Sequence, residues 1–365
     1  MVERVWEPEQ RHRRLVNPHP LPTAWVTVGP PVADYWGNIR ADGLDEPLDL
    51  DGVVDLAHPD GLHRVLLDGR LRRRLVVLGD AGAGKTVLLI RLALSILEFR
   101  RHLPDAERIE GPHGDASGWV PVLLRLPTWN PESQTLQEWI ASRLVADYGH
   151  RRPVSPNRLL PLLDGLDEMP REARARALVA IGAALGPSSP LVLTCRTSEY
   201  IDALIELREA GSRRPRFSNW PLCRLTPSEA ISRTEVPEGP HDWRTVFGRD
   251  AVEHGGRLVA ALNAPLWVDL ARVTYLDPGR PDDDPAELLV LPDRQAVHGL
   301  LLDRLVPSVY PDPPEADARG GKWRRRDAHR WLARLAIEMR VRGTQDIAWW
   351  EFVDGVPQWV RFLEG

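Results

Sequence analysis

A glycine-rich stretch, VVLGDAGAGKTVLL at residues 76–89, constrains the fold of this chain more than any other part of its sequence. Apolar residues precede the glycines and a longer amphipathic run follows them, which predicts a strand, a tight loop and a helix in that order. The spacing G-x-x-x-x-G-K-[ST] is matched by Gly79, Gly84, Lys85 and Thr86. Glycines let the backbone curl so that successive N–H groups and a helix N-terminus face phosphate groups. The stretch therefore predicts a phosphate-binding loop.

The lysine of this loop is rare in the chain, because only Lys85 and Lys322 of its 47 basic residues are lysines. A compact ammonium group on a flexible stem fits against the β and γ phosphates, whereas a planar guanidinium is bulkier and favours a forked geometry. An incidental lysine in a glycine-rich turn is the alternative. We expect Thr86 to offer its hydroxyl to Mg²⁺. The residues expected to contact the nucleotide here are Gly79, Asp80, Ala81, Gly82, Ala83, Gly84, Lys85, Thr86 and Val87.

A second motif, LLPLLDGLDEMP at residues 159–170, is an apolar strand that ends in carboxylates. We expect Asp164 to complete the Mg²⁺ shell, usually through water, because Mg²⁺ dehydrates reluctantly. Asp167 and Glu168 follow, where one of them could orient or deprotonate an attacking water. The sequence does not rank these two. Acidic turns after buried strands are common, so the motif gains its weight from lying about 80 residues after the glycine-rich loop.

Two further residues are candidates for contacts with a nucleotide. Arg196 follows the apolar run PLVLTC, at the strand edge where open α/β sheets bind ligands, and a cation there could sense a γ-phosphate. The alternative is an ordinary surface arginine. Pro265 interrupts a helical pattern in LNAPLWVDLAR and could pack on an adenine ring, although a plain helix break explains it equally well.

Short apolar runs alternate with longer amphipathic ones in the first two thirds of the chain, which predicts a parallel sheet with helices on both faces. We predict strands at 74–79, 119–126, 159–164, 190–195 and 220–225, and helices at 85–101, 135–148, 171–185 and 197–210. Helical patterns follow, at 255–276, 296–310 and 326–343. We interpret 1–70 as an N-terminal extension packed on the core, 71–225 as a P-loop NTPase domain, 226–312 as a helical domain and 313–365 as a C-terminal helical segment.

The net charge and the apolar content of the chain limit which partners and which location we expect. A net charge of -5 gives no reason to expect nucleic acid as the main partner. The N-terminus lacks the apolar core of a signal peptide, and no apolar span is long enough to cross a bilayer, so we expect a cytoplasmic chain. Cys195 and Cys223 lie in apolar segments and are expected to be buried thiols.

Together, GDAGAGKT, LLDGLDE, VLTCR and NAPLWVDLA resemble NACHT-type NTPases of the signal-transducing STAND class, in order and approximate spacing. Gly165 directly after Asp164, with the acidic pair displaced to Asp167 and Glu168, is similar to the NACHT variant. The flanking segments are similar to a group of actinobacterial NACHT proteins. The resemblance implies ATP or ADP with Mg²⁺, and an N-K-x-D guanine motif is absent. In that group, membrane-spanning helices often follow, which implies membrane association through a region beyond this chain.

Three functions remain open at this stage. The leading one is a slowly hydrolysing ATP switch that couples nucleotide state to domain arrangement or to assembly into homo-oligomers, with a role in bacterial defence or stress signalling; its trigger and effector are not named by the sequence. A metabolic P-loop enzyme such as a kinase is the second, and a scaffold that holds nucleotide without hydrolysis is the third.

Overall fold

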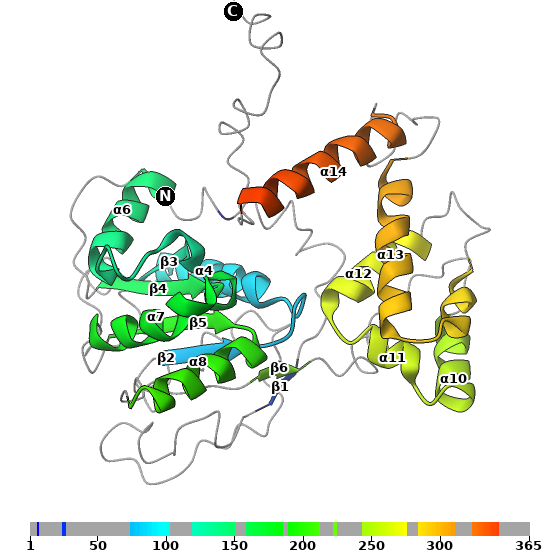
Figure 1. The fold of residues 1–365 in the computed structure, drawn as a ribbon, viewed down its shortest axis with the longest axis horizontal. Helices are drawn as coiled ribbons and strands as arrows, with labels where there is room; N and C mark the ends of the chain where they lie inside the picture. Colours follow the sequence, from blue (N-terminus) through cyan, green and yellow to red (C-terminus); the bar gives the residue numbers. More distant parts are fainter. Residues whose placement is uncertain are drawn as a thin grey trace, which may run out of the picture.

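The computed structural model describes residues 6, 24–26, 74–102, 119–149, 158–184, 189–211, 222–224, 243–275, 284–310 and 323–342. They form a sheet with helices on both faces, followed in sequence by a separate group of helices (Figure 1). The predicted fold class, a P-loop α/β sheet followed by an all-helical part, is confirmed. Most of the predicted N-terminal extension, and the segment after residue 342, lie outside the described residues.

The main sheet has four parallel strands in the spatial order β2-β5-β4-β3. The strands are β2 (Arg74–Leu78), β3 (Val120–Arg125), β4 (Leu159–Asp164) and β5 (Leu191–Cys195). Each falls within one residue of its predicted range. All residues of β4 and β5 are buried, as expected for central strands covered on both faces. Strand β5 therefore lies between the strand of the glycine-rich loop and the strand of the acidic motif.

Four helices cover the sheet and bury its two faces in separate apolar clusters (Figure 1). They are α4 (Lys85–Arg101), α6 (Leu136–Tyr148), α7 (Arg171–Ala184) and α8 (Thr197–Glu209). Because side chains alternate along a strand, Val76 and Leu78 face one cluster with α6, α7 and α8, whereas Leu75 and Val77 face the other with α4. A capping box begins α6, since Thr135 and Glu138 each bond the other's backbone N–H.

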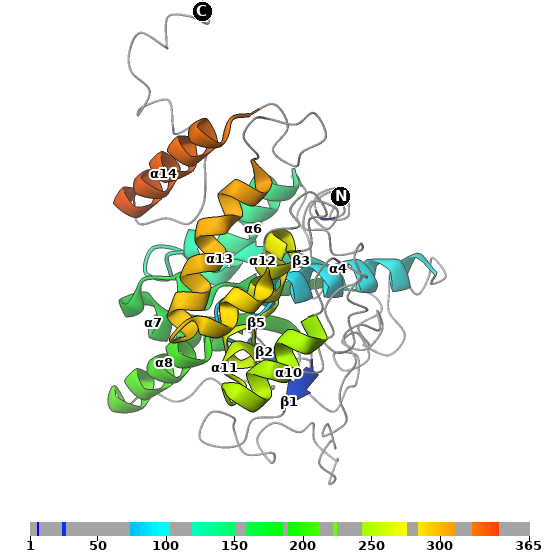
Figure 2. The ribbon, with the colours of Figure 1, turned by 90° about the vertical axis from the view of Figure 1, so that its right-hand side faces the viewer.

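The helices after the sheet bury a third apolar cluster of their own, and the turned view shows them in front of the sheet (Figure 2). They are α10 (Trp243–Glu253), α11 (Arg257–Ala261), α12 (Pro265–Tyr275), η7 (Pro285–Val290) and α13 (Arg294–Val309). Helix α14 (Arg325–Arg342) follows and contacts α13. None of the described helices is long and apolar enough to cross a membrane.

Three features differ from the sequence-based expectation or extend it. The strand predicted at 220–225 is β6 (Leu222–Arg224), which pairs antiparallel with β1 (Ala24–Val26) and is not part of the parallel sheet. Helix α10 was not predicted from its sequence; its formation is explained by packing, because Trp243 stacks on Phe247 and meets Tyr275 edge-on. Cys195 is a buried free thiol, and burial raises its pKa well above the usual range. The side chain of Cys223 lies outside the described residues.

Candidate functional site

The carboxyl ends of the four parallel strands meet at one edge of the sheet, where ligands bind in open α/β folds. Strand register sets which residues become neighbours there: Leu78 of β2 lies opposite Cys195 of β5, and Arg125 of β3 lies opposite Asp164 of β4. The glycine-rich loop follows β2 directly and leads into α4 (Figure 1). All three motifs at strand ends, which are far apart in the sequence, therefore reach the same edge.

The glycine-rich loop turns tightly between β2 and α4. Gly82 and Gly84 have φ angles of +76° and +88°, a backbone conformation that favours glycine. Lys85 curls back so that its Nζ donates to the carbonyl oxygens of Gly79 at 2.8 Å and Asp80 at 3.1 Å. Neither a capping side chain nor an acidic residue in the first turn neutralises the N-terminus of α4. The positive end of the helix dipole is thus directed into the loop.

A chain of hydrogen bonds joins the loop to the acidic motif. The Thr86 hydroxyl donates to Asp164 Oδ2 at 2.7 Å, across 78 residues of sequence. The other carboxylate oxygen, Asp164 Oδ1, accepts from the Thr194 hydroxyl at 2.5 Å, and that hydroxyl accepts from Gly165 N at 2.9 Å. Thr194 is fully buried and Asp164 is 8% exposed. Thr194 therefore fixes the orientation of the carboxylate that faces Thr86.

Asp167 is held by arginines on two sides. Its Oδ2 pairs with Arg196 Nε at 2.9 Å, and its Oδ1 accepts from Arg196 N at 3.1 Å. Arg174 of α7 donates to the backbone oxygens of Asp167 at 2.7 Å and Met169 at 3.0 Å. The Asp167 side chain is only 6% exposed. This carboxylate acts as an anchor for the backbone and side chain of Arg196.

Glu168 makes a different ion pair, with Arg125 at the end of β3. The distance from Arg125 Nη2 to Glu168 Oε2 is 2.9 Å, and the side chains are 42% and 25% exposed. The Glu168 side chain folds back over Gly165, where an added Cβ would come within 3.1 Å of Glu168 Cδ. Gly165 also has a φ of +81°, so its lack of a side chain permits both the turn and the position of the glutamate.

The start of α12 packs against the glycine-rich loop. Leu266 N donates to Gly82 O at 3.3 Å, and a Cβ added at Gly82 would lie 2.7 Å from Leu266 Cβ. A Cβ added at Gly84 would lie at ordinary contact distance, 3.8 Å, from Pro265 Cγ. Pro265 is the first residue of α12, a position that suits proline because its missing N–H costs no helical hydrogen bond. The helix break expected at Pro265 thus brings the helical part of the chain onto the loop.

Thr194 and Arg125 contact the acidic motif but were not identified as site residues from the sequence. Neither belongs to a spacing pattern. Each had only a weak signal: Thr194 is a polar residue inside the apolar run LVLTC, and Arg125 is a charged residue at the end of another apolar run. The residues that were expected to act together, Lys85, Thr86 and Asp164, lie in one hydrogen-bonded region with the loop.

The oxygen atoms at Thr86 and Asp164 suit Mg²⁺ better than a metal ion that is held entirely by protein side chains. No group of three or more His, Cys, Asp or Glu side chains that could hold a metal occurs among the described residues. A hydroxyl and one carboxylate, bonded to each other at 2.7 Å, are oxygen donors of the kind that hold Mg²⁺ together with water and substrate phosphates. Thr86 and Asp164 are therefore the residues that would hold Mg²⁺.

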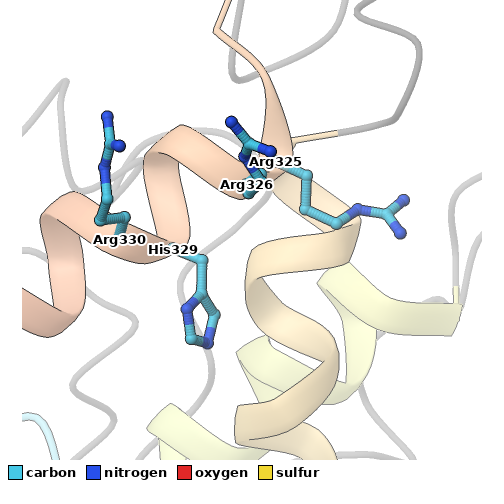
Figure 3. Close-up of a pocket in the computed structure, with 4 residues that line it drawn as sticks. All are labelled: Arg325, Arg326, His329 and Arg330. Atoms are coloured by element: carbon cyan, nitrogen blue, oxygen red, sulfur yellow. The ribbon is translucent and has the colours of Figure 1, made fainter.

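A second charged feature lies on α14, separated from the ends of β2 and β5 in both ribbon views (Figures 1 and 2). Arg325, Arg326, His329 and Arg330 line a cavity of about 500 Å³. Figure 3 shows that their side chains point in different directions, so they do not converge on one small ligand. We assign this cavity no part in the site at the sheet edge.

Comparison with known proteins adds little to this description. No protein-family model matches the chain, and no curated protein matches it. Among solved structures, a match is found to a cryo-EM reconstruction of the closed state of Hsp104 with ATPγS and FITC casein. It is 13% identical with a TM-score of 0.29, and it covers 67% of this chain and 39% of that chain. The match is too distant to support an argument about activity, so the geometry of the sheet edge carries the functional inference.

Proposed function

We propose that this chain binds ATP with Mg²⁺ at the sheet edge and hydrolyses it slowly, as a NACHT-type switch of the STAND class. The observation that carries the proposal is the 2.7 Å hydrogen bond between Thr86 and Asp164, beside a loop with a lysine turned into it. Two motifs that lie 78 residues apart are in contact, and together they contain the groups that would bind a nucleotide and its metal. A chance glycine-rich turn has no reason to meet a buried carboxylate in this way.

Each residue has a distinct task in the proposed reaction. The loop N–H groups and the α4 N-terminus bind the phosphates, and Lys85 exchanges its bonds to Gly79 O and Asp80 O for bonds to phosphate oxygens. Thr86 and Asp164 would hold Mg²⁺, which would supply positive charge against the phosphates. Glu168 or Asp167 orients the attacking water, and Arg196 senses the γ-phosphate.

The proposed switch couples the nucleotide to the helical part of the chain. Because Leu266 N bonds Gly82 O, a phosphate that reshapes the loop also acts on the first turn of α12. A Cβ built on Gly84 would lie 3.8 Å from Pro265 Cγ, which supports a contact between this proline and a bound nucleotide. Movement of α12 would then change the surface available for contacts with further copies of this chain. A role in bacterial defence belongs to this proposal and has no separate support in the site.

Substitution of the loop lysine tests the proposal. We predict that Lys85→Arg weakens binding of fluorescent ADP and ATP by about ten- to a hundredfold, because charge-assisted hydrogen bonds of about 1.5 to 3 kcal/mol are lost. Lys322→Arg is the matched control, since it changes the only other lysine, and should bind as the wild type does. Equal affinity for all three proteins would contradict the proposal.

The ion pairs at both acidic residues favour one alternative, a chain that holds nucleotide without hydrolysing it. Phosphate release with Mg²⁺ distinguishes the two: slow release that is lost in Glu168→Gln supports the switch. Nucleotide that stays intact over many hours supports the scaffold. Turnover that requires an added acceptor alcohol would identify a kinase-like enzyme.

A further inference from the structure

The two acidic residues after β4 are held by arginines from the strands on either side. Arg196 follows β5 and Arg125 ends β3, so strand order β5-β4-β3 places one guanidinium beside each carboxylate. The two pairs differ in accessibility. Asp167 is 6% exposed and uses both oxygens on Arg196, whereas Glu168 is 25% exposed and pairs through Oε2 with a guanidinium that is 42% exposed. The first pair is an anchor, and the second can open in water.

We propose that Arg125 is a positioning residue that restrains hydrolysis by holding the Glu168 carboxylate in an ion pair, and that Glu168 is the base. The bond from Arg125 occupies Oε2 of Glu168, and the side chain lies folded back over Gly165. The ion pair thus holds the carboxylate in one direction, so it is not free to turn toward a water at the γ-phosphate. Release of Arg125 frees Glu168, whereas Asp167 stays fixed to Arg196. The inference rests on the proposed function and also ranks the two acids, which the sequence does not.

The restrained step is the attack of water on ATP. The water oxygen forms a bond to the γ-phosphorus while one of its protons passes to the Glu168 carboxylate. The bond from that phosphorus to the oxygen bridging the β and γ phosphates breaks, and ADP and phosphate leave. While Glu168 is held in its ion pair with Arg125, its carboxylate is not turned toward the attacking water, so the fraction of molecules in which the pair is open limits the rate.

Removal of the restraint should raise turnover without changing binding. Because exposed ion pairs are worth about 0.2 to 1 kcal/mol, Arg125→Gln should raise kcat roughly two- to fivefold and leave KM and ADP affinity within about twofold. Arg125→Lys keeps a cation and should remain nearer the wild-type rate. Arg125→Gln combined with Glu168→Gln should be as inactive as Glu168→Gln alone. Arg176→Gln is the matched control, because Arg176 forms an exposed ion pair with Glu132 that includes no residue of the proposed site, and it should leave kcat unchanged.

Phosphate release and fluorescent-nucleotide binding are measured on the full chain and all variants, with thermal unfolding as a check on folding. A kcat for Arg125→Gln that is equal to or below the wild-type value, in a folded protein that binds ADP normally, would overturn the restraint. Loss of hydrolysis in Asp167→Asn with normal hydrolysis in Glu168→Gln would overturn the assignment of the base. If the wild type binds no nucleotide, the proposed function itself fails, and this result is distinct from both.

Discussion

At the scale of single residues, the hydroxyl of Thr194 decides how Asp164 is presented. It donates to Oδ1 at 2.5 Å and accepts from Gly165 N, so the second oxygen of the carboxylate is left for Thr86. We predict that Thr194→Val, which keeps the side-chain shape but removes the donor, weakens Mg²⁺-dependent ATP binding about tenfold. Thr194→Ser should restore most of it.

Titrations with Mg²⁺ and with EDTA separate positioning from general damage. Without the metal, Thr194→Val should bind nucleotide within about twofold of the wild type, because the loop and Lys85 act on the phosphates directly. A similar loss with and without Mg²⁺ would mean that Thr194 supports the fold and not the metal ligand.

At the scale of elements, the contact between the glycine-rich loop and α12 is the link between the two parts of the chain. We predict that Gly82→Ala loosens the first turn of α12, because an added Cβ would lie 2.7 Å from Leu266 Cβ. Gly149→Ala is a matched control: its φ is +65°, so the backbone strain is similar, but nothing lies within 4 Å of an added Cβ. Each substitution should cost about 1 to 2 kcal/mol through the left-handed backbone.

Amide hydrogen exchange measures the difference between these two variants. Exchange in the first turn of α12 should become faster in Gly82→Ala and stay unchanged in Gly149→Ala, although both variants carry the same kind of backbone strain. Equal exchange in α12 for the two variants would show that the loop does not support this helix.

At the scale of the whole molecule, Arg196 is expected to link the γ-phosphate to domain arrangement. Reversing a 1:99 population requires about 5.5 kcal/mol of differential binding, which several charge-assisted hydrogen bonds of about 1.5 to 3 kcal/mol could supply. We predict that small-angle scattering profiles with ADP and with a non-hydrolysable ATP analogue differ for the wild type and converge for Arg196→Ala, while ADP affinity is retained. Arg143→Ala, which removes an exposed ion pair with Asp147 on α6, should behave as the wild type. Superimposable wild-type profiles would favour an ordinary enzyme.

The sequence by itself determined the features that depend on local spacing. Glycines at 82 and 84, a lysine at 85 and the apolar runs on both sides are enough to predict β2, the loop and α4, because turn, strand and helix preferences are properties of neighbouring residues. The parallel sheet followed from the alternation of strands and helices. The interruption of the helical pattern at Pro265 was also readable, since it depends on the local backbone.

The tertiary structure alone decided which residues meet. Strand order and register bring Arg125 beside Glu168 and Thr194 beside Asp164. No sequence spacing encodes these pairs, because the members of each pair lie in, or directly after, different strands. The antiparallel direction of β6 could not be predicted from the sequence either, because its partner β1 lies almost two hundred residues earlier. The contact between α12 and the glycine-rich loop depends on how the chain runs from the core of the sheet to the core of the later helices. Local chemistry therefore predicts the nucleotide loop, whereas packing decides which arginine holds which acid.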